Sequence, residues 1–139
     1  NDWYYFRYNK TRWDYNKTMY DPCPKGWKIP QGGSDGVWAT ACGSSSHDYQ
    51  FDENNRGVNF GGVFGEDPMI WYPTSGSLYY NGEIINAGCV GEYWSFSSSD
   101  SSSFDGNGAY CFVGNLEGIV ATSHVIQRVF GCSVRCVKE

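Results

Sequence analysis

The residues best suited to covalent or metal chemistry in this sequence are six cysteines and two histidines. The cysteines occupy positions 23, 42, 89, 111, 132 and 136. Only Cys132 and Cys136 lie close together, in a CxxxC spacing, and neither His47 nor His124 completes a zinc-ligand pattern. An even number of cysteines in an acidic, loop-rich chain instead favours disulfides in an oxidising compartment. Six cysteines leave about 15 complete pairings open.

No set of nucleophile, base and orienting group is evident in the sequence. His124 has no carboxylate near it in the chain, and His47 lies in a polar stretch, so we interpret both as solvated loop residues. The carboxylates of Asp100, Asp105 and Glu117 lack the compact spacing of a calcium-binding loop. We therefore predict a protein that is not an enzyme, with no catalytic residue, no metal site and no cofactor.

Apolar and aromatic residues between positions 96 and 130 stand where loops usually carry turn-forming residues, which indicates a binding surface. The residues predicted to form this surface are Phe96, Phe104, Tyr110, Val113, His124, Val125, Ile126, Val129 and Phe130. A contiguous patch of the last four apolar members would favour a protein ligand over a sugar. In the alternative interpretation several members, above all Tyr110, face the core of a structural module.

Composition limits the possible partners. The net charge is −5, the isoelectric point is about 4.9, and only 10 residues are basic, which argues against a nucleic-acid ligand. No apolar run approaches the roughly 20 residues of a transmembrane helix. The 139 residues fit a single domain, which we expect to be monomeric. Because the chain opens in what reads as mid-domain sequence, we expect it to be the C-terminal part of a longer exported protein.

The first 30 residues combine aromatic rings with a rigid segment. Residues 1–20 are rich in Trp and Tyr, and either cover the core as an edge strand and loop or form a sugar-stacking platform. Two Asn-Lys-Thr runs, beginning at Asn9 and Asn16, match the N-glycosylation pattern. Prolines on both sides of Cys23 hold that residue in an extended or turning backbone, so it suits a disulfide. A short strand is expected at residues 27–29.

The best helix candidate spans residues 34–43. Ser34 is placed to cap its N-terminus, and Gly43 to end it. Trp38, Ala41 and Cys42 would then share one face. The following residues, 44–56, are expected to form a polar loop.

From residue 57 onward the pattern predicts short strands separated by glycine-containing turns. The expected strands are 58–60, 63–64, 69–72, 78–80, 83–86, 92–96, 109–113, 118–121 and 133–137. Asn81-Gly82 is a strong hairpin signal between two of them. Residues 97–108 are Ser-, Asp- and Gly-rich, and we interpret them as a long hairpin loop, with a disordered linker as the alternative.

Four ordered motifs resemble the Fibrobacter succinogenes major paralogous domain, a family found at the C-termini of exported Bacteroidetes proteins, including fimbrillin-like adhesins. They are DPCPKGWKIP at 21–30, WYPTSG at 71–76, GEYWS at 91–95 and GCSVRCV at 131–137. The resemblance covers the chain from about Trp13 onward. It implies an α+β fold of the C-type-lectin-like kind, close to formylglycine-generating enzymes, with short antiparallel strands, long loops and one or two short helices. In that fold the termini meet and an irregular region carries the ligand surface.

Some proteins of that fold are variable proteins of diversity-generating retroelements, which are randomised near the C-terminus. This chain departs from the family at residues 123–127, where polar residues are typical, and at Val129, Phe130 and Cys132. Such departures within conventional framework match a diversified copy, and ordinary drift is the alternative. A resemblance of fold to formylglycine-generating enzymes does not transfer their cysteine chemistry.

The resemblance also bears on the disulfides. Cys23 and Cys136 match the family's recurring cysteines, and meeting termini would bring them together, so this bond is expected. Cys111 and Cys132 are candidates to face each other on neighbouring strands, which leaves Cys42 and Cys89. Together these points predict an extracellular ligand-binding domain at a cell surface or fimbrial tip, with a protein or glycan ligand on another cell or host surface. The alternatives are a structural pilin-like module and a carbohydrate-binding module.

Overall fold

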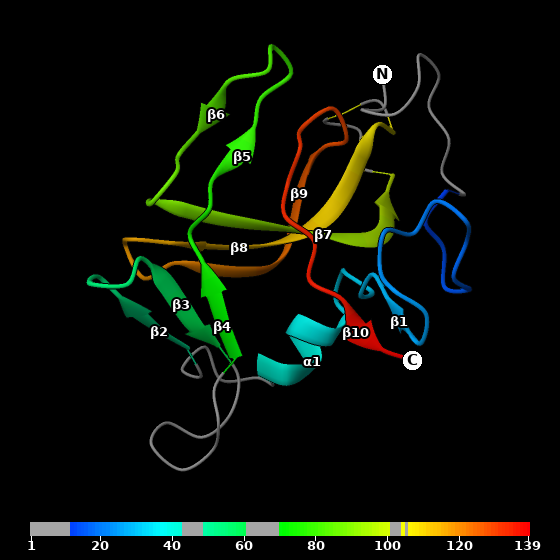
Figure 1. The fold of residues 1–139 in the computed structure, drawn as a ribbon, viewed down its shortest axis with the longest axis horizontal. Helices are drawn as coiled ribbons and strands as arrows, with labels where there is room; N and C mark the ends of the chain where they lie inside the picture. Colours follow the sequence, from blue (N-terminus) through cyan, green and yellow to red (C-terminus); the bar gives the residue numbers. More distant parts are fainter. Residues whose placement is uncertain (1–11, 43–48, 61–69, 101–103, 105) are drawn as a thin grey trace.

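The computed structural model describes residues 12–42, 49–60, 70–100, 104 and 106–139. Within these residues the chain forms one helix and ten strands (Figure 1). The helix is α1 (Val37–Cys42). The strands are β1 (Trp27–Lys28), β2 (Tyr49–Asp52), β3 (Gly57–Phe60), β4 (Ile70–Pro73), β5 (Ser77–Leu78), β6 (Ile84–Ile85), β7 (Val90–Ser99), β8 (Gly108–Asn115), β9 (Val120–Gln127) and β10 (Val137–Lys138).

The strands belong to four antiparallel sheets, β1–β10, β2–β3–β4, β5–β6 and β7–β8–β9. The expected abundance of short antiparallel strands is confirmed. Helix is scarce in the described part, where α1 is six residues long, so an α+β description fits only loosely. No described helix is long and apolar enough to cross a bilayer.

The β7–β8–β9 sheet has a hydrophobic core on each of its two faces. Tyr93 pairs with Phe112, and the adjoining pair is Trp94 with Cys111. Because successive side chains of a strand point to opposite faces, these two pairs enter different cores. The first core consists of Trp38, Val58, Tyr72, Tyr93 and Phe112. The second core consists of Trp94, Ala109 and Cys111.

Aromatic contacts fill the first core. The Tyr72 ring lies 4.7 Å from that of Phe112 and 5.0 Å, edge to face, from that of Tyr93. Each polar ring atom there has a partner: Trp38 Nε1 donates to Tyr72 Oη at 2.9 Å, and Tyr93 Oη donates to the Pro73 carbonyl at 2.6 Å. Buried polar atoms cost stability unless they are paired, so these bonds allow large amphipathic rings to be used as core residues.

The second core is covered by segments from both ends of the chain. The residues packed against it are Trp13, Val113, Ile126, Phe130, Cys132 and Val134. Trp13 serves as core cover because it packs against this cluster, and its Nε1 donates to the Tyr20 carbonyl at 3.0 Å. Tyr15 instead remains 64% exposed, with Lys28 Nζ 4.1 Å from its ring centroid.

The two ends of the described chain are tied together. β1 pairs with β10, and the expected disulfide between Cys23 and Cys136 is present. The Asp21 carboxylate accepts hydrogen bonds from the backbone N–H groups of Cys23 and Ile29, at 2.8 and 3.1 Å. The loop that carries Cys23 is therefore fixed on both sides of the cysteine.

Several predicted elements are confirmed in place. The hairpin at Asn81-Gly82 joins β5 to β6, with Gly82 N–H donating to the Tyr79 carbonyl at 2.9 Å and a positive φ of 88° at Gly82. β7 and β8 pair as the two arms of a hairpin, as expected, but residues 97–99 and Gly108 of the expected loop belong to the strands. The helix also exists, but its position is shifted.

Four predictions about elements are corrected. α1 begins at Val37, because Ser34 and Asp35 lie in a turn and the Gly36 carbonyl accepts the first helical bond, from Thr40 N–H at 2.9 Å. Of the predicted helix face, Trp38 is buried but Ala41 is exposed. Part of the expected loop 44–56 forms strand β2, and the last expected strand is reduced to β10.

Other predictions fall on parts of the chain that the structure does not describe. These are residues 1–11 with Asn9, Gly43 and His47, the strand 63–64, Asp105, and the side chain of Cys42.

We expect the double variant Cys23→Ser/Cys136→Ser to be destabilised by about 5 kcal/mol in the chain-entropy model, because the bond joins residues 113 positions apart. Urea denaturation of the variant and the wild type measures the difference. Cys89→Ser, which changes an exposed free thiol, is the control and should remain near wild type. A double variant as stable as this control would contradict the prediction.

Stability should also fall at alkaline pH through Tyr93. Burial raises the pKa of Tyr93 to about 12. In the unfolded chain the phenol ionises near its ordinary pKa of about 10, so the stabilisation is complete below about pH 10 and is lost between about pH 10 and 12. Tyr93→Phe should therefore show a shallower decline in urea midpoint over this range.

The control for this experiment is Phe112→Leu, which lowers stability at every pH without removing an ionisable group. If Tyr93→Phe declines as steeply as Phe112→Leu, Tyr93 is not the source of the alkaline loss.

Candidate ligand-binding surface

The nine residues predicted to bind a ligand lie on the three strands of the β7–β8–β9 sheet and in the turns that follow β7 and β9. Only His124 is exposed, and the other eight are partly buried. Residues 123–127, expected as a variable loop, form the second half of strand β9. The segment is thus held by backbone pairing to β8, and its side chains alternate between the two faces of the sheet.

This alternation divides the predicted surface. Tyr110 pairs with Val125, and Ala109 pairs with Ile126. Side chains directly opposite each other share a face, so Val125 lies on the face of Tyr110 while Ile126 lies on the face of the second core. Val125 and Ile126 therefore cannot belong to one contiguous patch.

The remaining members gather in separate places. Val125 and Phe104 approach each other over Gly108, where an added Cβ would lie 2.8 Å from Val125 Cγ1 and 3.3 Å from Phe104 Cδ2. Val113 and Phe130 pack against the second core together with Ile126.

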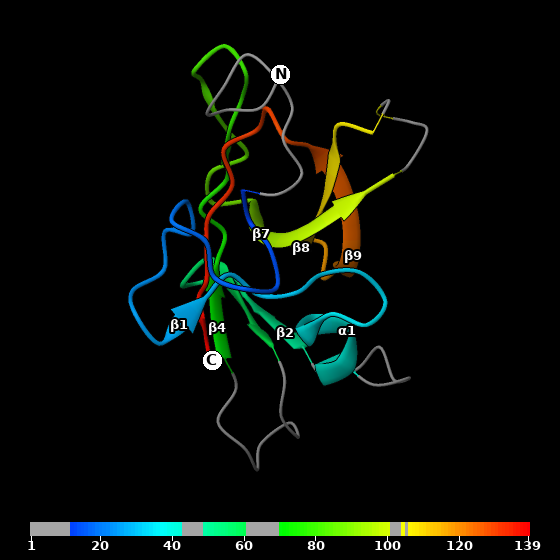
Figure 2. The same cartoon turned by 90° about the vertical axis from the view of Figure 1, so that its right-hand side faces the viewer.

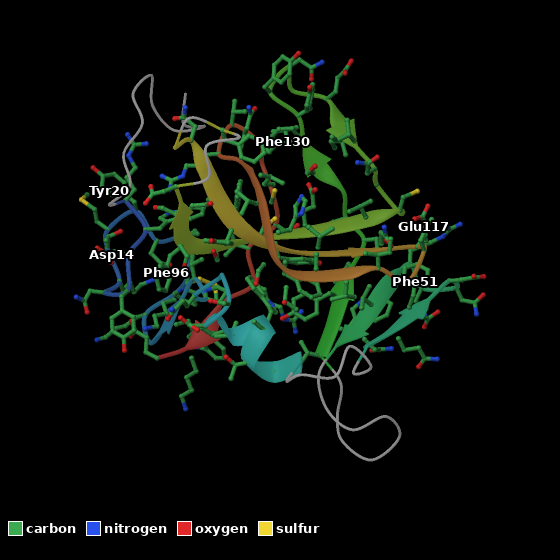
Figure 3. All side chains as sticks on the ribbon, turned by 180° about the vertical axis from the view of Figure 1, so that it is seen from behind. Asp14, Tyr20, Phe51, Phe96, Glu117 and Phe130 are labelled. Carbon is green, nitrogen blue, oxygen red and sulfur yellow. A yellow bond between two sulfur atoms is a disulfide. The ribbon has the colours of Figure 1, made fainter. Side chains whose placement is uncertain are left out.

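Phe96 stands apart from the others. Its ring contacts that of Tyr15, with centroids 6.4 Å apart. Figure 3 shows Phe96 on the side of Asp14 and Tyr20, and Phe130 beside the β5–β6 hairpin. The structure thus brings together smaller groups and not a single surface.

Phe130 connects the C-terminal segment to the β5–β6 hairpin. Its ring lies 5.0 Å from that of Tyr79 in an edge-to-face arrangement. Leu78 and Gly131 exchange two backbone hydrogen bonds, of 2.7 and 2.8 Å. The hairpin is therefore fixed at its base to the chain that follows β9.

Large apolar side chains are exposed on this hairpin. Leu78 is 45% exposed, Tyr80 65% and Ile84 71%. Leu78 and Ile84 are a direct cross-strand pair and so share one face. We define the hairpin surface as the exposed residues Leu78, Tyr80 and Ile84, whereas Tyr79, the residue after Leu78, packs against Phe130. The hairpin surface lies where the hairpin projects from the rest of the molecule (Figure 1).

Sequence reasoning did not select the hairpin members of this surface. The available signal was the apolar residues on both sides of the Asn81-Gly82 turn, in strands too short to build a second layer over themselves. A two-stranded hairpin cannot bury both of its faces, so some of these side chains had to meet either solvent or a partner.

The cysteines near the second core are free thiols. Cys111 is buried, and Cys132, partly buried, donates a long hydrogen bond from its sulfur to Glu92 Oε2 at 3.8 Å. Cys111 belongs to the second core and Cys132 packs against it, but the structure has no disulfide between them. Burial, together with the Glu92 carboxylate, raises the pKa of both thiols well above the usual range. They are therefore protonated at neutral pH and poor nucleophiles.

Two features of the described residues bear on catalytic or metal chemistry. Among them, His124 has no hydrogen-bond or ion-pair partner that could orient it as a base. Within the same residues there is no group of three or more His, Cys, Asp or Glu side chains placed to hold a metal ion. The surface features that stand out are apolar and aromatic.

Comparison with known proteins adds no relative. No protein-family model matches the chain, and neither the curated proteins nor the solved structures contain a significant match. The family resemblance therefore remains an expectation that rests on the four sequence motifs.

Thiol labelling should follow the burial of the cysteines. Maleimide applied to the native protein should modify Cys89, which is exposed, and should spare Cys111 and Cys132. After unfolding in urea, all three should react. Peptide mass spectrometry identifies the labelled positions, and equal native labelling of the three would contradict the arrangement of the second core.

Proposed function

We propose that this chain is a non-enzymatic ligand-binding domain of an extracellular adhesin, and that it binds a protein partner through the hairpin surface. The observation that carries the proposal is the exposure of Leu78, Tyr80 and Ile84 on a hairpin that is anchored to the body of the domain. Exposed apolar groups gathered in one place are typical of interaction sites.

The anchoring matters for affinity. The Tyr79 ring contacts that of Tyr80, at a centroid distance of 4.1 Å, and that of Phe130. Tyr80 is therefore linked through Tyr79 to the chain that follows β9. A contact surface that is already ordered loses less conformational entropy on binding. Tyrosine adds large contact area at low entropic cost. The aliphatic chains of Leu78 and Ile84 offer no hydrogen bonds, which favours a protein partner at this surface.

The C-type-lectin-like fold and the location at a cell surface or fimbrial tip are parts of the same proposal. Meeting ends are a feature of that fold, and here β1 pairs with β10 beside the Cys23–Cys136 bond. A disulfide is also typical of proteins exposed to an oxidising compartment. The four motifs add the link to exported adhesins.

A second candidate function is a structural, pilin-like module, which the packing of Ile126 and Phe130 against the second core favours. The same packing limits the positions at which sequence diversification would be tolerated. Exposed His124 accepts replacement more readily than Ile126, because changes of volume in a packed core cost stability.

Surface plasmon resonance with a panel of purified extracellular-matrix and cell-surface proteins tests the binding function. The wild-type domain should bind at least one of them saturably. Tyr80→Ser/Ile84→Ser should weaken that binding by about tenfold or more, as expected for apolar residues central to an interface.

Met19→Ser/Ile119→Ser is the matched control, because it removes two exposed apolar side chains outside the hairpin surface. It should bind like the wild type. Saturable binding to no panel member would favour the structural module, and equal losses in both variants would remove the hairpin from the proposal.

A further inference from the structure

The β2–β3–β4 sheet has one face in the first core and a second face with a different composition. Phe51, Val58 and Tyr72 lie opposite one another across the three strands and face the core. The next row, Gln50, Asn59 and Trp71, therefore points to the other face. This outer row places a tryptophan beside two amides.

This outer face is hollowed into an open depression of about 550 Å³, lined by Asp52, Asn55, Asn59 and Trp71. Small-molecule sites combine an apolar wall with a few placed polar groups. Here one indole supplies the apolar wall, and three carboxylate or amide side chains supply the polar groups.

The position of the indole depends on a glycine. A Cβ at Gly57 would lie only 2.2 Å from Trp71 Cζ2 and 2.5 Å from Cη2, so the Trp71 ring occupies the space that a side chain at position 57 would fill. The backbone of Trp71 is fixed as well, because its carbonyl accepts a hydrogen bond from Arg135 Nη1 at 2.6 Å. The ring therefore lies across the sheet in a defined place.

The polar groups are held in an equally defined way. Asp52 Oδ1 accepts from the N–H groups of Asn54 and Asn55, at 3.0 and 3.1 Å, and Asp52 Oδ2 accepts from Asn55 Nδ2 at 2.7 Å. These bonds, led by that from the Asn55 side chain, hold the pKa of Asp52 below its usual value. The Arg56 carbonyl accepts from Thr74 N–H at 2.9 Å, which ties this turn to the end of β4.

Asn59 is the polar group of the depression whose hydrogen-bonding capacity is free for a ligand. It is the direct cross-strand neighbour of Trp71, and its side-chain amide makes no hydrogen bond to any described residue. A primary amide supplies two donors and an acceptor, and the ionised Asp52 carboxylate supplies further acceptor sites. Donors and acceptors thus stand side by side at the edge of an aromatic ring.

From this arrangement we propose that the Asp52–Asn55–Asn59–Trp71 depression binds a neutral pyranose sugar without a metal ion. The C–H groups on one face of a pyranose pack against an aromatic ring, and its vicinal hydroxyls each need both a donor and an acceptor. The amide of Asn59 and the carboxylate of Asp52 match a pair of hydroxyls, while the negative charge of Asp52 disfavours acidic sugars.

This site is independent of the hairpin surface. Figures 1 and 2 show the β5–β6 hairpin above the β7 and β8 strands and the β2–β3–β4 sheet below them. The two surfaces share no residue, so an experiment can disprove one proposal without affecting the other.

Isothermal titration calorimetry and saturation-transfer NMR in the presence of EDTA test the proposal. The probes are methyl glycosides of glucose, galactose, mannose, fucose and N-acetylglucosamine, together with cellobiose, maltose and lactose. At least one should bind with millimolar affinity, and the C–H protons on one face of its ring should receive the strongest saturation transfer.

Two variants locate the binding. Trp71→Ala should weaken it by about tenfold, through loss of the ring contact. Asn59→Ala should weaken it by roughly fivefold through loss of hydrogen bonds. Asn59→Ala leaves the first core untouched and keeps the test decisive if Trp71→Ala fails to fold.

Trp27→Ala is the matched control, since Trp27 is an indole 43% exposed on β1, and it should bind sugar like the wild type. Tyr80→Ser/Ile84→Ser should also retain sugar binding, which separates this proposal from that of the hairpin surface. Binding of no probe, binding only of acidic sugars or peptides added as comparison ligands, or full binding by Asn59→Ala and Trp71→Ala would overturn the proposal.

Discussion

The two-sided burial of the β7–β8–β9 sheet governs the rest of this structure. Tyr93 and Trp94 are neighbours in the chain, yet each fills a different core, and Phe112 and Cys111 repeat the division on β8. A slip of one residue in the pairing would exchange the contents of both cores. The pairing register of β7 and β8 therefore decides which elements pack on each face of this sheet.

The cover of each face comes from a different part of the chain. The first core is closed by α1 and the β2–β3–β4 sheet, through Trp38, Val58 and Tyr72. The second core is closed by the chain ends, which the Cys23–Cys136 bond and the β1–β10 pair hold in place. Because much of the hydrophobic sequence is used in these two layers, residues 123–130 serve as framework more than sequence reasoning expected.

Surfaces available to a ligand arise where an element extends beyond these layers. The β5–β6 hairpin leaves Tyr80 and Ile84 in solvent because it has no second layer above it. The outer face of the β2–β3–β4 sheet carries Trp71 and Asn59 because its inner face already supplies the core. One surface is aliphatic and aromatic and the other aromatic and polar, so different ligand chemistry suits each.

Local rules in the sequence determined the hairpin at Asn81-Gly82, a helix containing Trp38 and most of the strands, because turn conformation and alternation act over a few residues. The motif resemblance added the Cys23–Cys136 bond. Tertiary structure alone decided that β2 is a strand, that Val125 and Ile126 face opposite ways, and that Trp71 lies over Gly57. These features depend on register and on partners distant in sequence. An alternating pattern shows that two faces exist, but only packing decides which face meets the core and which meets solvent.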